Sequence, residues 1–296
     1  MRAPAPSRQT GLLIITVAFL IAPGMDVFAK LLTQTVSPGQ TVLGRFLIQT
    51  TLLLPLLALF SQWSRPRLGH WVAGVFLAAA LLCFNAALQV MPIANAIAIF
   101  FVEPLILTVL SALILKEQIG WRRILAVLVG LIGAMIVIRP NFAAYGPTAL
   151  LPLGTALGFA GYVLINRVMT VGGNLLALQF WTGVGSSVVI GAACLWGHGA
   201  DVTVLVLDWP TVREAWLFLG MGAMAVLTHQ MLVLALSMLP ASVLAPMQYL
   251  EIVSATLFGW WIFGDFPDLL TWVGTAIIIG AGVYVFHRER KVKGEP

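Results

Sequence analysis

The sequence predicts an all-α integral membrane protein, with ten transmembrane helices arranged as two inverted five-helix repeats around a central cavity. Three observations predict this fold class. Hydrophobic residues make up 60% of the 296-residue chain and charged residues only 9%, whereas about a quarter of the residues in a soluble domain are charged. Apolar runs of roughly twenty residues, long enough to cross a bilayer as helices, recur along the whole length. Finally, residues 148 positions apart carry the same chemistry.

The apolar runs define the expected elements in order. Ten helical spans are predicted at 11–33, 40–60, 70–90, 93–115, 121–138, 147–168, 175–196, 213–238, 241–263 and 269–287. Turn and helix-breaking residues separate them, as in Ser37-Pro38-Gly39 and Arg139-Pro140-Asn141. The first run contains Asp26 and Lys30 and has no clean cleavage site, which favours a retained first span over a signal peptide.

The repeat is visible when the sequence is shifted against itself by 148 residues. This shift aligns Pro92 with Pro240, Glu103 with Glu251, Thr108 with Thr256 and Ile114 with Ile262. It predicts a first repeat at 11–138 and a second at 147–287. Because each repeat has an odd number of spans, the second enters the bilayer upside down, an arrangement that recurs in secondary transporters.

The basic residues predict the orientation. If the spans alternate, one side of the membrane receives Arg2, Arg8, Arg65, Arg67, Lys116, Arg122, Arg123, Arg167, Arg288, Arg290, Lys291 and Lys293. The positive-inside rule then places both termini in the cytoplasm, in a bacterial-type inner membrane. The formal charge of +5 is therefore interpreted as a topology signal, and no nucleic-acid partner is expected.

Charged and polar side chains inside the spans are the candidate site. A charge at the centre of a membrane is costly and marks a functional position by default. Glu103 and Glu251 each lie about ten residues from the ends of their spans, near the bilayer centre at 1.5 Å of rise per residue. The residues expected to bind substrate are Asp26, Lys30, Arg45, Glu103, Gln248, Tyr249 and Glu251. Proton coupling is assigned to Glu103, Glu251 and His229.

Structural interpretations of the same residues stay open at this point. Asp26 and Lys30, four residues apart on one helix face, can neutralise each other, and Asp26 can instead pair with Arg45. Glu103 can satisfy backbone groups that Pro104 frees. A neutral, hydrogen-bonded core position is the alternative for His229. The glycines in Gly130-Leu131-Ile132-Gly133 and Gly280-Ala281-Gly282 are expected to allow close helix packing.

These motifs resemble the drug/metabolite transporter superfamily, in particular its ten-helix members with two EamA-type repeats. The resemblance covers nearly the whole chain. The residues on which the resemblance rests are Met25-Asp26 with Lys30, Gly44-Arg45-Phe46, Phe101-Val102-Glu103-Pro104 with Leu115-Lys116-Glu117, Tyr249-Leu250-Glu251, and Phe263-Gly264-Asp265-Phe266-Pro267-Asp268. The second repeat departs from the first by having Ile252 where Pro104 stands. The resemblance implies a carrier of amino-acid, nucleoside-like or vitamin substrates.

The expected function is secondary transport of a small polar or zwitterionic metabolite by alternating access. Its expected partners are that metabolite and the lipid bilayer, and the chain is either a monomer or an oligomer. An intramembrane enzyme is the alternative from another class, but no GxSxG or HExxH motif is present. We therefore expect no enzyme activity, no cofactor and no metal. A channel or a multidrug exporter is a further alternative, although a lipophilic cargo would leave the buried charges unpaired.

Overall fold

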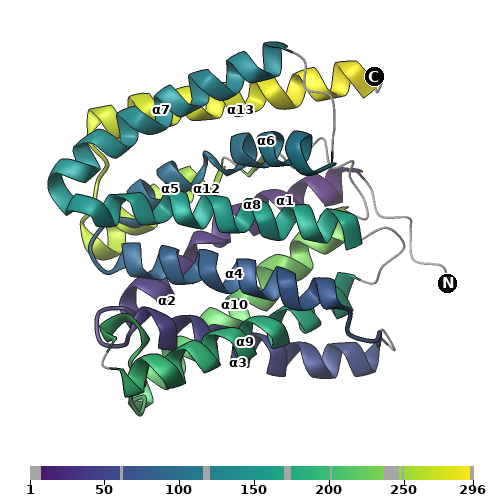
Figure 1. Ribbon diagram of the computed structural model, residues 1–296, viewed down its shortest axis with the longest axis vertical. Helices are drawn as coiled ribbons and strands as arrows, with labels where there is room; N and C mark the ends of the chain where they lie inside the picture. Colours follow the sequence, from purple (N-terminus) through teal and green to yellow (C-terminus); the bar gives the residue numbers. More distant parts are fainter. Residues whose placement is uncertain are drawn as a thin grey trace.

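The computed structural model describes residues 8–60, 63–115, 121–169, 175–200, 202–236, 247–248 and 250–293, and all regular elements in these ranges are helices (Figure 1). They are α1 (Arg8–Ile21), α2 (Pro23–Leu32), α3 (Pro38–Leu59), α4 (Leu68–Leu88), α5 (Ile93–Phe100), α6 (Glu103–Leu115), α7 (Trp121–Tyr145), η1 (Gly146–Leu150), α8 (Leu151–Met169), α9 (Leu175–Gly199), η2 (Thr203–Leu205), α10 (Val212–Leu236), α12 (Leu250–Phe258), η3 (Gly259–Phe263) and α13 (Leu269–Lys293). The prediction of an all-helical fold is confirmed for these residues.

Within the described residues, seven stretches are long and apolar enough to cross a membrane. They are Gln9–Leu32, Pro38–Leu59, Leu68–Leu88, Ile93–Ile114, Leu128–Asn166, Leu176–Gly199 and Val212–Leu232. The 39-residue stretch Leu128–Asn166 contains α7, η1 and α8, and Gly146 turns the chain between them at a φ of 62°. Two shorter apolar helical stretches, Leu250–Phe263 and Leu269–Ala281, follow near the C-terminus.

Two of the predicted spans are interrupted. In the span 93–115, α5 ends at Phe100 and α6 begins at Glu103. Pro104 explains this break, since proline has no N–H and disfavours helical backbone at the residue before it. The span 11–33 is divided in the same way where Pro23 begins α2. Most of the start of the span 241–263 lies outside the described residues.

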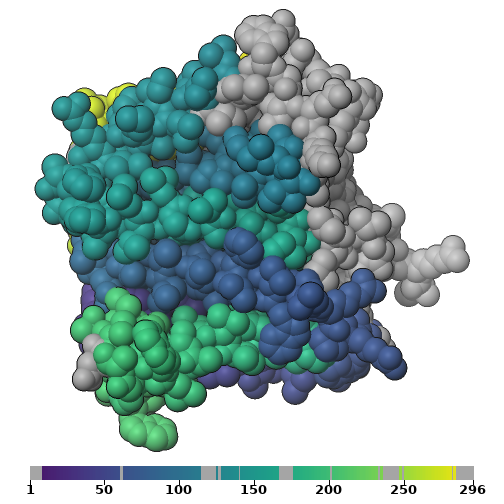
Figure 2. All heavy atoms as spheres, in the orientation of Figure 1, coloured from purple at the N-terminus to yellow at the C-terminus, as the bar shows by residue number. Residues whose placement is uncertain are grey.

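The helices lie side by side in a stack, with their axes running roughly across the view of Figure 1. α7 packs on α13 at one edge of this stack, and α3 packs on α9 at the other. Between these edges, α8 packs against α4 and α6, while α10 packs against α1, α2 and α3. Figure 2 shows one face of the molecule, where blue and teal side chains of α4, α7 and α8 lie above green side chains from around α9.

The connections between helices lie at the two ends of this stack. The α2–α3, α4–α5, α7–α8 and α9–α10 connections lie at one end (Figure 1). The start of α1 and the end of α13 lie at the opposite end. The described chain therefore begins and ends on the same side of the helical stack.

Large apolar side chains cover the outside of the helices. Leu13, Leu113, Met135, Leu195 and Trp216 are each 66–71% exposed, although they lie on five different helices. A soluble monomer rarely exposes so much apolar surface. Because lipid tails are as apolar as leucine, this surface is the expected covering of a membrane protein.

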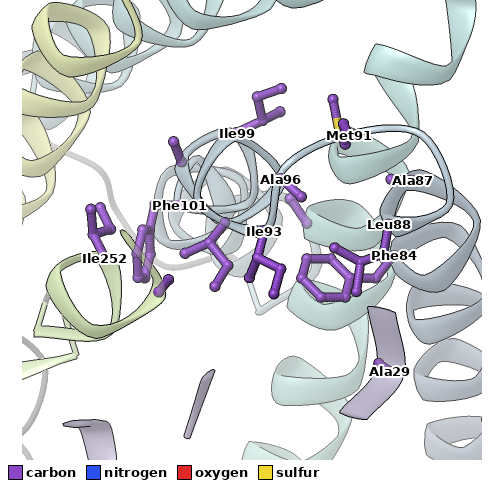
Figure 3. Packing of buried hydrophobic residues seen from close by; sticks show 14 of the residues in the cluster. Ala29, Phe84, Ala87, Leu88, Met91, Ile93, Ala96, Ile99, Phe101 and Ile252 are labelled. Carbon is purple, nitrogen blue, oxygen red and sulfur yellow. The ribbon is translucent and has the colours of Figure 1, made fainter. Parts of the chain in front are cut away.

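The largest buried cluster lies around α5, where the two halves of the chain meet. Ile93, Ile99 and Phe101 are at most 1% exposed, and Ile252 of α12 belongs to the same cluster. Figure 3 shows Phe101 beside Ile252 at the crossing of the two segments. Glu103 lies two residues after Phe101, and Glu251 directly precedes Ile252. The packing of Phe101 and Ile252 therefore positions both glutamates.

Close helix packing occurs at some of the predicted glycines. A Cβ atom on Gly133 of α7 would lie 2.9 Å from the backbone oxygen of Gly274 on α13, and one on Gly130 would collide with Leu105. The prediction for these two positions is confirmed. It is wrong for Gly280, because Gly274 rather than Gly280 faces α7, and no atom of the described residues lies within 4 Å of a Cβ added at Gly280. The surroundings of Gly282 lie outside the described part of the structure.

Candidate functional site

Arg45 lies at the centre of a group of polar side chains from five helices. It is 3% exposed on α3, and the preceding Gly44 lets α3 approach Phe218 of α10. The guanidinium interacts electrostatically with Asp26 of α2 and Tyr162 of α8. The guanidinium also interacts electrostatically with His229 of α10. Through Asp26, the group extends to Glu251 of α12.

The Arg45 guanidinium is buried without a full set of partners. Its Nε and Nη1 atoms are inaccessible and make no hydrogen bond to the described part of the chain. Among the described residues no carboxylate oxygen lies within 4.0 Å of it. The guanidinium carbon lies over the ring of the neighbouring Phe46, 5.2 Å from the ring centroid. An unsatisfied buried donor costs about 1–3 kcal/mol, and more when it is charged. These donors therefore indicate a place where a further acceptor binds.

Asp26 is the carboxylate that interacts with this cation, and Glu251 is a second carboxylate that interacts with Asp26. Glu251 lies in the first turn of α12, where its backbone N–H donates to the Gln248 oxygen at 3.0 Å. A helix N-terminus stabilises negative charge, which suits a carboxylate at this position. Gln248 is half-buried in the adjoining turn, and Tyr249 lies outside the described residues.

Glu103 occupies the corresponding position in the first half of the chain. It begins α6, is 5% exposed, and its Oε1 has no hydrogen-bond partner. The Pro104 oxygen accepts from Thr108 Oγ1 at 2.8 Å. Glu103 Oε1 accepts no hydrogen bond from the described part of the backbone. No charged side chain of the described part of the chain interacts with Glu103, so the structure does not join it to the Arg45 group.

Lys30 lies apart from that group. Its Nζ is 2.5 Å from Asp265 Oδ2 and 4.6 Å from the centroid of the Phe263 ring. The interpretation that Asp26 and Lys30 neutralise each other is therefore wrong, because Lys30 faces the connection between η3 and α13. Gly264, at a φ of 75°, ends η3 and turns the chain into this connection.

His229 makes a hydrogen bond within its own helix. Its Nδ1 lies 2.8 Å from the Ala225 oxygen, and a carbonyl can only accept, so Nδ1 carries the proton. This agrees with the hydrogen-bonded core histidine that the sequence left open as an alternative. A role for His229 in proton transfer stays a prediction.

Two residues of α8 complete the group and were not among the predicted site residues. The Tyr162 hydroxyl is hydrogen-bonded to the Asn166 side chain and interacts electrostatically with Arg45. Their spacing of four residues places them on one helix face. That spacing was the available signal, since two polar residues on one face of an apolar span mark an inward surface. Gln49, one turn after Arg45, adds a buried oxygen without a partner.

The arrangement of mainly apolar helices around a buried group of mixed charges is typical of a membrane transport protein. The EamA-like transporter family matches residues 9–139 and 146–286, so the chain belongs to this family and contains two EamA repeats. The resemblance to the drug/metabolite transporter superfamily is thereby confirmed.

Named relatives cover nearly the whole chain. An S-adenosylmethionine uptake transporter of Rickettsia bellii is 29% identical over 90% of this chain and 89% of its own length. A riboflavin transporter of Vibrio cholerae is 28% identical over 93% and 91%, and a pseudopaline exporter of Pseudomonas aeruginosa is 26% identical over 95% and 98%. A solved crystal structure matches with a TM-score of 0.65 at 17% identity, covering 97% of this chain and 99% of that one, and supports the fold alone.

Proposed function

We propose that the protein is a secondary transporter that moves a small polar or zwitterionic metabolite across a bacterial-type inner membrane by alternating access. The observation that carries the proposal is the buried Arg45, with donors that have no partner, beside Asp26 and within the same group as Glu251. These residues come from both halves of the chain. In secondary transporters built from repeats, the substrate site lies between the repeats near the middle of the membrane.

Matching helices support two repeats offset by 148 residues. α7 spans Trp121–Tyr145 and α13 spans Leu269–Lys293, so both of their bounds differ by this offset. Glu103 and Glu251 both lie in the first turn of their helices. One of the seven long apolar stretches contains both α7 and α8, so it counts as two crossings. Together with the two shorter stretches, this gives the ten crossings of the proposal.

The packing of the helices supports an inverted arrangement of these repeats. If the five spans of one half are exchanged with those of the other, the α7–α13, α3–α9 and α5–α12 contacts each map onto themselves. The α4–α8 contact maps onto the contact of α10 with α1 and α2, and α4–α9 maps onto α3–α10. A pseudo-two-fold axis relates pairs in this way, and it gives the protein two equivalent routes to a site near the axis.

Orientation in the membrane follows from the charges. We place both termini in the cytoplasm, since the basic residues gather at the connections on that side of the predicted topology. Asp208, Asp265 and Asp268 then lie toward the outside. The Lys30–Asp265 pair consequently lies at the outer end of the site, where it joins α2 of the first half to a connection of the second half.

The Lys30–Asp265 ion pair is expected to hold the outer side closed. Asp265→Lys removes the attraction and should lower the uptake rate severalfold, because partly exposed ion pairs contribute up to about 1 kcal/mol. Lys30→Asp combined with Asp265→Lys restores the attraction with the charges exchanged, and should recover part of the rate. Uptake into proteoliposomes measures both, with Asp268→Asn as the control. Equal rates in the single and double variants would show that the pair has no part in closure.

The decisive experiment is uptake by the purified protein in liposomes. Radiolabelled S-adenosylmethionine and riboflavin, the substrates named for relatives of this chain, are the first probes, followed by amino acids. Saturable uptake that unlabelled probe competes away, with no ATP present, is the expected result. An imposed pH gradient tests proton coupling, since an unchanged rate excludes it. Release of a chemically altered product would instead favour an intramembrane enzyme.

A further inference from the structure

We infer that Arg45 binds a carboxylate of the cargo while Asp26 and Glu251 bind its cationic group, so that the cargo carries an α-amino-acid-type group. This inference rests on the proposed transport function and assigns the chemistry of its substrate. It follows from three features of the buried group: the free donors of Arg45, the repulsion between the two carboxylates, and the engagement of Lys30 elsewhere.

The free donors of Arg45 favour a carboxylate. A guanidinium binds a carboxylate with two parallel hydrogen bonds, and it has two edges through which it can do so. Nε belongs to one edge and Nη1 to the other, and both atoms are buried without a hydrogen-bond partner. Asp26 is the acidic side chain in electrostatic reach of Arg45. If Asp26 occupies one edge when the site closes, the other edge remains for a carboxylate of the cargo.

The two carboxylates favour a cation beside them. Asp26 and Glu251, both half-buried, interact with each other as like charges, which is unfavourable unless a positive group lies nearby. Arg45 faces Asp26, but no interaction between Arg45 and Glu251 is present among the described residues. Lys30, one turn further along α2 than Asp26, is paired with Asp265. An ammonium or another cationic centre of the cargo would relieve this repulsion.

The two subsites share Asp26, which interacts with both Arg45 and Glu251. We assign them to a carboxylate and an ammonium carried by one small molecule, as in an α-amino acid. S-adenosylmethionine carries this pair of groups, whereas riboflavin has neither a carboxylate nor an ammonium. The group around Arg45 thus distinguishes between the two kinds of cargo named for relatives of this chain.

The test compares carboxylate recognition between the parental protein and Arg45→Lys. Lysine keeps the positive charge but lacks both bidentate edges. Binding to the purified protein in detergent is measured by thermal shift and calorimetry, with S-adenosylmethionine, the standard L-amino acids and riboflavin as probes. The tightest carboxylate-bearing probe is then compared with its methyl ester. Arg213→Lys, on an exposed side chain at the start of α10, is the matched control.

We expect the parental protein and Arg213→Lys to bind the carboxylate about 10- to 100-fold more tightly than the ester, as for hydrogen bonds to charged groups. In Arg45→Lys this preference should shrink to within about threefold, because a lysine makes no bidentate contact. A preference that persists in Arg45→Lys overturns the inference. Uptake of riboflavin alone would retain the transport function and overturn the carboxylate site. Absence of uptake and binding for every probe would overturn both.

Discussion

Glu251→Gln is expected to lower transport by about tenfold or more while leaving the protein folded. Glutamine keeps the shape of glutamate but removes its charge, and a buried neutral amide is less costly in a membrane than a buried carboxylate. The change removes the carboxylate that interacts with Asp26, the acidic neighbour of Arg45. A loss of one charged hydrogen bond corresponds to about 1.5–3 kcal/mol, or roughly 10- to 150-fold. The initial rate of uptake per folded protein measures it.

Glu103→Gln provides the comparison within the same experiment. Glu103 has the equivalent position in the first repeat, but its Oε1 has no partner and no charged neighbour in the described part of the chain. We expect reduced transport here as well, with thermal stability unchanged or higher. Glu214→Gln is the control, because Glu214 lies outside the Arg45 group: its Oε2 accepts from the Thr211 N–H at 2.7 Å at the start of α10, and its side chain is also hydrogen-bonded to Thr35. Parental rates in both Glu103→Gln and Glu251→Gln would make the carboxylates structural.

The sequence predicted the helical class well because its signal is distributed over many residues. Runs of apolar residues are hardly altered by the neighbours of any one of them, so helices occupy most of each predicted span where the chain is described. The boundary predicted at Arg139-Pro140-Asn141 was wrong, because α7 continues through these residues to Tyr145. The interruption before Glu103 was foreseeable from Pro104. The sequence did not predict that Phe101, just before Glu103, packs against Ile252, just after Glu251 (Figure 3). This contact between the two halves of the chain is visible only in the structure.

The side-chain partners within the site were harder to predict. Spacing along one helix suggested Asp26 with Lys30, but the partner of Lys30 is Asp265, 235 residues further along the chain. The joining of Arg45 to Tyr162 and His229 likewise depends on how separate helices meet. Local periodicity specifies which face of a helix a residue occupies. The residue of another helix that it contacts depends on how the helices pack, which the local sequence does not specify.

The same limitation applies to the glycines and leads to the prediction with the largest effect on folding. Gly133 was expected to allow close packing, and its partner is Gly274, six residues before the predicted Gly280 on α13. A Cβ atom on Gly274 would lie 2.5 Å from Val137 Cγ2, 2.7 Å from the Gly133 oxygen and 3.0 Å from the Val137 nitrogen. Because two of these atoms belong to the backbone of α7, they cannot move aside without displacing the helix.

Gly274→Leu should therefore separate α7 from α13 and destabilise the protein by about 1–3 kcal/mol or more, as for overpacked cores. Gly280→Leu on the same helix meets no atom within 4 Å of its Cβ, and leucine favours a helix over glycine by up to about 1 kcal/mol. It should leave stability equal or raised. Thermal unfolding of both variants in the same detergent, followed by the amount of monodisperse protein, measures the difference. Equal melting temperatures for the two variants would exclude close packing of α7 on α13 at Gly274.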